Sequence, residues 1–193
     1  MGGHVILWIL LLVCSWRTSA AQAQQPPRTD PVEVAALEAI LGRWNKTTSP
    51  VWSMSSEPCR GVPVDGVTGL DGNPKNNPGI KCDCSYINGT FCHITQLKVY
   101  ALNVVGQIPA ELQNFTYLNY LGISLTNFTG QLPEELGNLT KLQRLYTDSA
   151  GLSGPFPSTF SKLKNLKLLR ASDNDFTGKI PDYIGSLTNL EDL

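Results

Sequence analysis

The second half of the chain repeats itself every 24 residues, and this period constrains the fold more than any other feature. The same step recurs in a glycine column, a proline column and two columns of leucine or isoleucine. The columns are Gly106, Gly130, Gly154 and Gly178; Pro109, Pro133, Pro157 and Pro181; Ile94, Leu118, Leu142, Leu166 and Leu190; Leu97, Leu121, Leu145, Leu169 and Leu193. A fixed period of roughly 20–29 residues marked by leucines is the signature of a leucine-rich repeat solenoid.

Each repeat is expected to begin with a short strand and to continue through a sharp turn. Strand side chains alternate between faces, so Leu121 and Ile123 should point inward while Gly122 and Ser124 point outward. Stacked repeats bury a leucine core that no single repeat could bury alone. The glycines suit a left-handed turn, and each proline keeps the preceding residue extended. The pattern predicts an α/β solenoid over 94–193, with four repeats and the start of a fifth.

The repeat form x-x-L-x-G-x-I-P-x-x-L-G-x-L resembles the plant-type extracellular leucine-rich repeat. That resemblance implies an asparagine four residues before each glycine, with its amide bonded to the neighbouring backbone. Here the column reads Leu102, Thr126, Ala150 and Asn174. Asn174 alone can do this fully, so the other turns must find hydrogen bonds elsewhere, because unpaired buried backbone groups are costly.

The amino terminus has the pattern of a secretory signal peptide spanning 1–23. Val5 to Val13 is apolar throughout, and Ala21-Gln22-Ala23 offers a small-x-small cleavage site. A membrane anchor would need roughly 20 apolar residues, and this run is too short. No second run of spanning length follows, so we expect a secreted, extracellular chain with no membrane span of its own.

Residues 24–93 are predicted to form an amino-terminal cap with one helix at about 31–44. Asp30 suits the N-cap, Pro31 suits the first helical position, and Glu33 stands at the capping-box position. Apolar residues follow at helical spacing: Val34, Leu37, Ile40, Leu41 and Trp44. The apolar face of this helix has to be buried against another part of the protein. Because repeat arrays need caps at their ends, we expect the helix to cover the open end of the first repeat.

Four cysteines lie in or just after the loop-rich part of the cap, between 45 and 88: Cys59, Cys82, Cys84 and Cys92. In a secreted chain an even count predicts disulfides. A Cys82–Cys84 bond is geometrically poor because it closes a very small ring. Cys59–Cys82 with Cys84–Cys92 is favoured, and Cys59–Cys84 with Cys82–Cys92 is the runner-up. A zinc site formed with His93 is a further alternative, but C-x-C spacing suits zinc poorly.

The cap and the first repeat together resemble the amino-terminal region of a plant leucine-rich repeat receptor-like serine/threonine kinase. The residues that carry the resemblance are a helix ending in Trp44, the segment 79–85 (GIKCDCS), the segment 90–95 (TFCHIT) and the segment 97–102 (LKVYAL). The closest subfamily adds a malectin-like extracellular domain. The family implies a transmembrane helix and a kinase domain farther along, but this chain has no G-x-G-x-x-G, H-R-D or D-F-G motif.

The chain ends partway through a repeat, so we expect it to be a fragment of a longer receptor or the product of a truncated gene model. The carboxy-terminal end of the repeat array would then be open, with no following turn to cover Leu187, Leu190 and Leu193. Burying one leucine contributes about 1.5–3 kcal/mol, so three exposed ones would forfeit several kcal/mol.

Five N-x-S/T sequons predict N-glycosylation on the surface of a secreted chain. They stand at Asn45, Asn88, Asn114, Asn127 and Asn138. Asn114 and Asn138 differ by one period and therefore share a face. Glycans there would keep that face free of partners, or would serve folding and solubility alone.

Catalysis has no candidate residues, so we predict neither an enzyme nor a cofactor nor a metal. The mature chain has one histidine, His93, and no defensible Ser/His/Asp set. Adjacent Glu134 and Glu135 point apart, and the basic run from Lys162 to Arg170 reads as a solvated face. A net charge of −1 gives no argument for nucleic acid.

Recognition on the concave sheet is the remaining function. Outward positions of the strands carry aromatic and charged residues of the kind that dominate binding interfaces. The predicted ligand-binding residues are Lys98, Tyr100, Tyr120, Arg144, Tyr146, Asp148, Arg170 and Ser172. The expected partners are a protein, a peptide or a cell-wall glycan, together with a co-receptor ectodomain.

Two function classes remain open from the sequence. The favoured one is the ligand- or co-receptor-binding ectodomain of a receptor-like kinase at the outer face of the plasma membrane. The alternative is a free secreted repeat protein that inhibits a pathogen's cell-wall hydrolase or acts as a decoy receptor. The Cys82-x-Cys84 cap and the Lys98-Val99-Tyr100 repeat start favour the first.

Overall fold

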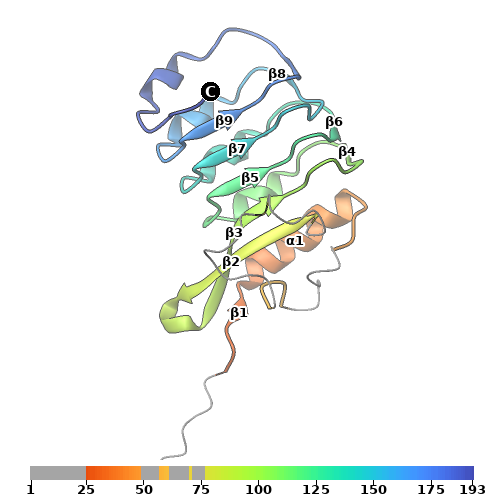
Figure 1. Ribbon diagram of the computed structural model, residues 1–193, viewed down its shortest axis with the longest axis vertical. Helices are drawn as coiled ribbons and strands as arrows, with labels where there is room; N and C mark the ends of the chain where they lie inside the picture. The colour runs from red at the N-terminus through yellow and green to blue at the C-terminus, as the bar shows by residue number, and fades with distance from the viewer. Residues whose placement is uncertain (1–24, 49–56, 61–69, 71–76) are drawn as a thin grey trace, which may run out of the picture.

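The repeats stack along one axis, so that their strands form a continuous parallel sheet along the solenoid (Figure 1). The computed structural model describes residues 25–48, 57–60, 70 and 77–193, and the predicted signal peptide lies outside these ranges. The sheet runs in the order β1, β3, β5, β7, β9: Arg28–Thr29, Phe91–Lys98, Tyr120–Gly122, Arg144–Tyr146 and Leu168–Arg170. The parallel solenoid sheet predicted from the 24-residue period is confirmed.

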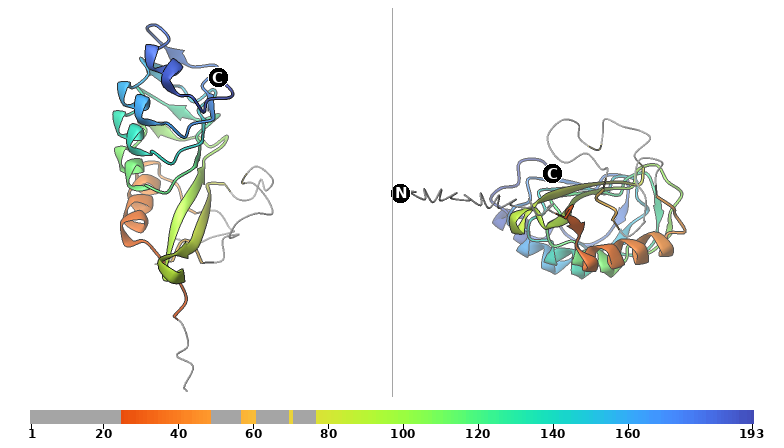
Figure 2. Two further views of the ribbon diagram at one scale, coloured as in Figure 1. Left: turned by 90° about the vertical axis from the view of Figure 1, so that its left-hand side faces the viewer. Right: turned by 90° about the horizontal axis from the view of Figure 1, so that it is seen from below.

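The opposite side of the solenoid is lined by short 3-10 helices, one after each proline of the repeat (Figure 2). They are η3 (Ala110–Asn114), η4 (Glu134–Asn138), η5 (Ser158–Lys162) and η6 (Asp182–Ser186). Each repeat also has a second short strand, which follows its strand in the main sheet. These second strands form two parallel pairs: β4 (Val105–Gly106) with β6 (Asn127–Phe128), and β8 (Ser153–Gly154) with β10 (Asp175–Phe176). The repeat glycines have positive φ, as expected; Gly130 has φ +81° and Gly154 has φ +74°.

Helix α1 (Pro31–Arg43) extends the column of 3-10 helices at the amino-terminal end of the solenoid (Figure 2). Its apolar face is buried in the core through Leu37, Ile40 and Leu41. The ring of Trp44, just past the helix, lies 5.5 Å from the ring of Phe128. Arg43 at the end of the helix pairs with Glu111 of η3, so the predicted covering of the first repeat by this helix is confirmed.

The helix begins as predicted, except that Glu33 does not close a capping box. Asp30 Oδ1 accepts hydrogen bonds from the N–H groups of Val32 (2.8 Å) and Glu33 (3.4 Å), which makes it the N-cap. The Asp30 N–H donates to the carbonyl of Cys92, so it is no longer available to Glu33. The Glu33 carboxylate turns inward instead and meets strand β3.

Strand β2 (Gly79–Tyr86) was missed, because the sequence up to residue 88 was expected to be loop-rich. It pairs antiparallel with β3, and this hairpin ends in the short helix η2 (Ile87–Gly89). The segment lacks clean alternation of apolar and polar residues, so its strand character comes from pairing. Strand β3 crosses the expected boundary between residues 93 and 94 and serves both the cap and the first repeat.

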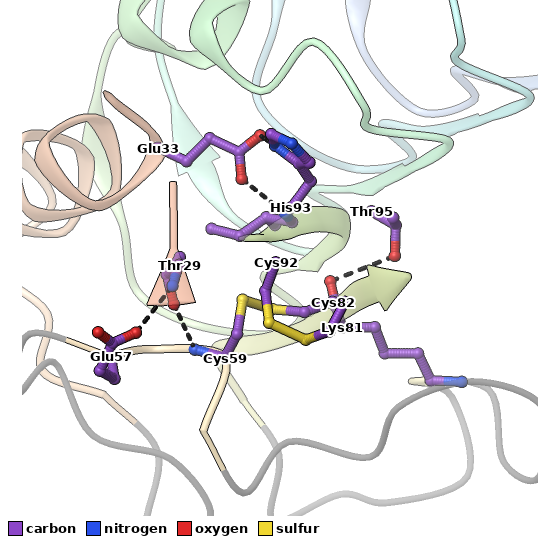
Figure 3. Close-up of a disulfide and its surroundings, with 11 residues drawn as sticks. Thr29, Glu33, Glu57, Cys59, Lys81, Cys82, Cys92, His93 and Thr95 are labelled. Atoms are coloured by element: carbon purple, nitrogen blue, oxygen red, sulfur yellow. Dashed lines mark hydrogen bonds and ion pairs between the residues drawn. A yellow bond between two sulfur atoms is a disulfide. The ribbon is translucent and has the colours of Figure 1, made fainter. Parts of the chain in front are cut away.

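Both disulfides of the favoured pairing are present, Cys59–Cys82 and Cys84–Cys92. Their sulfurs are therefore not available to zinc. The segment around Cys59 is also hydrogen-bonded to β1: the Cys59 N–H donates to Thr29 Oγ1 (3.1 Å), and the Thr29 N–H donates to Glu57 Oε2 (2.7 Å) (Figure 3). These contacts join the cysteine-rich segment to the sheet.

Asn174 fills its predicted role at the turn of its repeat. Its Oδ1 accepts from the N–H groups of Ala150 (3.1 Å) and Leu152 (3.0 Å), and its Nδ2 donates to the carbonyl of Thr147 (2.7 Å). Thr126 replaces part of this bonding, with its hydroxyl 3.2 Å from the carbonyl of Ile123.

Two of the three carboxy-terminal leucines are more covered than expected. Leu187 is buried and belongs to the main core, because the carbonyl of Ile184 accepts its N–H and the turn directs its side chain inward. Leu190 is partly buried against the same core, and Leu193 is exposed.

Candidate ligand-binding face

The strand register places the predicted residues in columns that run across the sheet. Lys98 pairs with Gly122, Gly122 with Tyr146, and Tyr146 with Arg170. Tyr120 is level with Arg144 in a second column. Because alternate strand residues share a face, these side chains rise from the same surface of the sheet.

A third column continues where the strands end. It holds Tyr100, Ser124, Asp148 and Ser172, and hydrogen bonds from the neighbouring repeats hold Asp148 in place. The Leu125 N–H donates to the carbonyl of Asp148 (2.9 Å), and the Ser172 N–H donates to Asp148 Oδ1 (3.1 Å).

The first two columns and the third border one hollow of about 350 Å³ at the amino-terminal half of the sheet. Five predicted residues line it together with three others: Lys98, Tyr100, Tyr120, Tyr146 and Asp148, with Gly122, Ser124 and Leu125. Arg144, Arg170 and Ser172 do not line this hollow. Leu125 was not predicted, because a leucine just outside a strand resembles a core residue.

Tyr120 was expected to face solvent, and this was wrong: its side chain is 6% exposed. Its ring folds over Gly122, where an added Cβ would lie 2.9 Å from the tyrosine oxygen. Tyr146 packs beside it with a ring-to-ring distance of 5.4 Å. Ser124, also expected to point outward, is buried as well. Tyr120 therefore forms the floor of the hollow and leaves the walls to other residues.

The cationic side chains around the hollow already have partners. Lys98 Nζ donates to the carbonyl of Leu70 (3.2 Å) and lies 5.3 Å from the centre of the Tyr100 ring. Arg144 lies 5.8 Å from the centre of the Tyr120 ring. Farther along, Arg170 is hydrogen-bonded to Asp192 (3.1 Å).

The cap supports the rim of the hollow, which sequence reasoning missed. Asn77 Oδ1 accepts the N–H of Tyr100 (3.0 Å), and Asn77 Nδ2 donates to the Tyr100 carbonyl. Leu70 supplies the carbonyl that binds Lys98. No short-range pattern connects these cap residues to the first repeat, so only the tertiary fold reveals the contact.

The repeat architecture agrees with a family model. Residues 90–193 match the model described as "Leucine-rich repeat region". The chain belongs to the leucine-rich repeat family.

Curated relatives of this leucine-rich repeat chain are plant receptors. It is 43% identical over 114 residues to a probable leucine-rich repeat receptor-like serine/threonine-protein kinase of Arabidopsis thaliana, covering 59% of this chain and 11% of the relative. A second such Arabidopsis kinase is 45% identical over 98 residues, with 51% and 9% covered. The chain thus spans about a tenth of the length of these relatives, and the matches lie in the repeat-bearing part.

Solved structures place the same architecture in plant proteins. The chain is similar to a plant ice-binding protein (TM-score 0.66, 26% identity, 86% of this chain and 49% of that chain). It is similar to PEPR1 in its complex with AtPEP1 (TM-score 0.60, 27% identity, 81% and 20% covered). It also resembles the Arabidopsis receptor kinase HAESA in complex with the peptide hormone IDA and the co-receptor SERK1 (TM-score 0.50, 37% identity, 51% and 17% covered). The chain is a repeat ectodomain resembling the ligand-binding regions of plant receptor kinases.

The sequons lie away from the hollow. Asn45, Asn88, Asn127 and Asn138 are exposed, and Asn114 is half-buried. Asn114 and Asn138 end the neighbouring helices η3 and η4 on the side opposite the sheet. No sequon asparagine lines the hollow.

The described residues contain no group of three or more His, Cys, Asp or Glu side chains placed to hold a metal ion. His93 is buried, its Nδ1 lies 3.0 Å from Glu33 Oε1, and its ring stacks on Tyr117 at 3.9 Å. Within the same described ranges, no helix has the length and apolar character needed to span a membrane.

Proposed function

We propose that this chain binds an extracellular peptide on its concave sheet, as part of the ectodomain of a plant receptor-like kinase. The observation that carries the proposal is the tyrosine-lined hollow on that sheet. Rigid aromatic side chains supply contact area at low entropic cost and are enriched among residues that dominate binding energy. The resemblance to HAESA in its complex with the peptide hormone IDA supports a peptide over a glycan.

The remaining assignments belong to the same proposal. Residues 1–23 direct the chain to the secretory pathway, and the two disulfides suit an oxidising compartment. Glycans on the five sequons would shield the flanks and the helical side. A co-receptor ectodomain would bind the complex, and the complete receptor would carry a malectin-like domain, a membrane span and a kinase.

Binding of peptides from apoplastic fluid tests the proposal. The secreted chain, immobilised, is exposed to the peptide fraction of plant apoplastic fluid; bound peptides are identified by mass spectrometry, resynthesised and titrated by calorimetry. Tyr146→Ala or Arg170→Ala should weaken binding by tenfold or more with little change in melting temperature. Lys162→Ala and Ser186→Ala on the opposite side serve as matched controls.

Two outcomes would contradict the proposal. Equal loss from the controls, with none from Tyr146→Ala and Arg170→Ala, would move the site to the other face. Inhibition of a fungal cell-wall hydrolase by the chain, with no peptide bound on the sheet, would favour the secreted-inhibitor function.

A further inference from the structure

Leu125 occupies an unusual backbone position at the edge of the hollow. It has φ +54° and its side chain is 46% exposed. The corresponding residues of the other repeats share this left-handed conformation but are small or polar: Ala101, Ser149 and Asp173. A left-handed conformation is unfavourable for a branched apolar residue, and such strain concentrates at functional sites.

Tyr100 is a second exposed apolar side chain in the lining of the hollow. It is likewise 46% exposed, and Asn77 fixes its backbone. Leu125 and Tyr100 are thus exposed apolar side chains in the lining of a hollow that also includes Tyr146 and Asp148. A lining that combines apolar side chains with a carboxylate suits a group that is apolar along its length and charged at its tip.

Tyr146 and Asp148 have unused capacity for a cation, because Lys98, which lines the same hollow, donates to the carbonyl of Leu70. Asp148 Oδ1 accepts from the Ser172 N–H, but Asp148 Oδ2 has no hydrogen-bond partner among the described residues. Tyr146 lies two residues earlier on the same strand face, and no cationic side chain within the described ranges lies over its ring. The guanidinium of Arg170 is hydrogen-bonded to Asp192. This bond is the main cause that raises the pKa of Arg170, and the charge of Asp148 adds to the rise.

Tyrosine faces already bind cations elsewhere in this chain. Lys141 Nζ lies 3.5 Å from the centre of the Tyr117 ring, and Arg144 lies over Tyr120. A cation near an aromatic face is attracted by the ring quadrupole, and a neighbouring carboxylate adds charge complementarity. An unoccupied tyrosine face beside a partly unpaired carboxylate therefore favours a cationic group.

We propose that the hollow receives a basic side chain of the peptide ligand, arginine in preference to lysine. Its aliphatic stem packs between Leu125 and Tyr100, and its guanidinium lies against Tyr146 and binds Asp148. Long basic side chains bury their stems while keeping the charged head in polar surroundings. Arginine is preferred because its planar head both stacks on an aromatic ring and pairs with a carboxylate. This assignment rests on the proposed peptide-binding function and adds the chemistry of one anchor residue.

The direct test uses Nα-acetyl-L-argininamide as the probe and saturation-transfer NMR as the readout. A small ligand of this size is expected to bind with a Kd in the millimolar range. Asp148→Asn keeps the acceptor for the Ser172 N–H and removes the charge, so it should weaken the probe by about fivefold or more. Leu125→Asn should weaken it by about threefold, with melting temperature unchanged or raised, because asparagine tolerates positive φ.

Ser149→Asn is the control, since it places asparagine at nearly the same φ (+50° against +54°) one repeat away, outside the lining of the hollow. It should leave probe binding unchanged. The assignment is wrong if Nα-acetyl-L-leucinamide, Nα-acetyl-L-glutamic acid amide or a β-1,4-linked glucose trimer binds the hollow as well as the arginine probe. Unchanged binding in Asp148→Asn, or a lower melting temperature in Leu125→Asn with normal binding, would also overturn it.

The two proposals fail in distinguishable ways. If a captured peptide depends on Tyr146 but not on Asp148 or Leu125, the peptide-binding function stands and the arginine anchor falls. If no captured peptide depends on the concave sheet while the arginine probe still binds the hollow, the cation site stands and the peptide-binding function falls.

Discussion

Glu33 on helix α1 and His93 on strand β3 are 60 residues apart in the chain, yet their side chains meet in the interior (Figure 3). Glu33 Oε1 lies 3.0 Å from His93 Nδ1, and Glu33 Oε2 accepts the Ile94 N–H at 2.6 Å. Both side chains are buried. This contact fixes the capping helix to the strand shared by the cap and the first repeat.

Removing the Glu33 carboxylate should destabilise the cap by leaving buried groups unpaired. Glu33→Ala strands the Ile94 N–H, and an unsatisfied buried donor costs about 1–3 kcal/mol. Glu33→Gln is the matched variant, because its amide can accept from Ile94 and donate to His93, so its loss should be smaller. Urea denaturation of both variants measures the difference. Equal losses would show that the hydrogen bonds contribute nothing beyond packing.

The same residue should make stability depend on pH. Burial raises the pKa of the Glu33 carboxyl above its ordinary value of 4.5, although the Ile94 N–H and His93 oppose the rise. A carboxyl whose folded-state pKa is raised contributes stability that is fully present below the unfolded pKa and is lost as pH rises through the folded pKa. The free energy of unfolding of the wild type, relative to Glu33→Gln, should therefore fall as pH increases through that range.

Denaturation of the two proteins at a series of pH values checks this, and repeating the comparison with His93→Asn in both removes the imidazole that contacts Glu33. A difference that rises with pH would mean that the bonds from Ile94 and His93 outweigh burial.

The disulfides should differ modestly in their contribution. Loop closure predicts about 3.4 kcal/mol for a ring the size of Cys59–Cys82 and about 2.5 kcal/mol for the smaller Cys84–Cys92 ring. Non-reducing peptide mapping of the secreted chain should find no free thiol among these four cysteines. Cys59→Ser should cost about 2–5 kcal/mol and reduce secretion. A zinc content near one per chain with free thiols under denaturant would contradict both pairings.

The turn at Asn174 should be sensitive to substitution. Asn174→Ala leaves the N–H groups of Ala150 and Leu152 without their acceptor and the Thr147 carbonyl without a donor. We expect a loss of about 2–3 kcal/mol, since these groups are partly buried. Thr126→Ala, which removes hydroxyl bonds at the equivalent position, should cost less. The midpoint of urea unfolding distinguishes the two, and a larger loss in Thr126→Ala would contradict the assignment.

Patterns in the sequence predicted much of this fold, because residues one repeat period apart lie beside each other in the stacked repeats. The 24-residue period fixed the strand register, so Lys98, Tyr146 and Arg170 were placed in one column without knowledge of the structure. The same logic failed for Tyr120, since a period gives the face of a residue but not the direction in which its ring folds. Gly122 leaves the space that the ring fills, and that is a contact between side chains.

The sequence by itself determined the repeat solenoid, the capping helix and the single full asparagine turn, because each depends on residues a few positions apart or on an exact period. The tertiary structure decided what depends on segments distant in the chain. It paired β2 with β3, turned Glu33 away from its capping box toward His93, and brought Leu70 and Asn77 against the first repeat. The hollow itself is lined by residues of the repeats, but the cap holds Lys98 and Tyr100 at its edge, and no local pattern encodes where two distant segments touch.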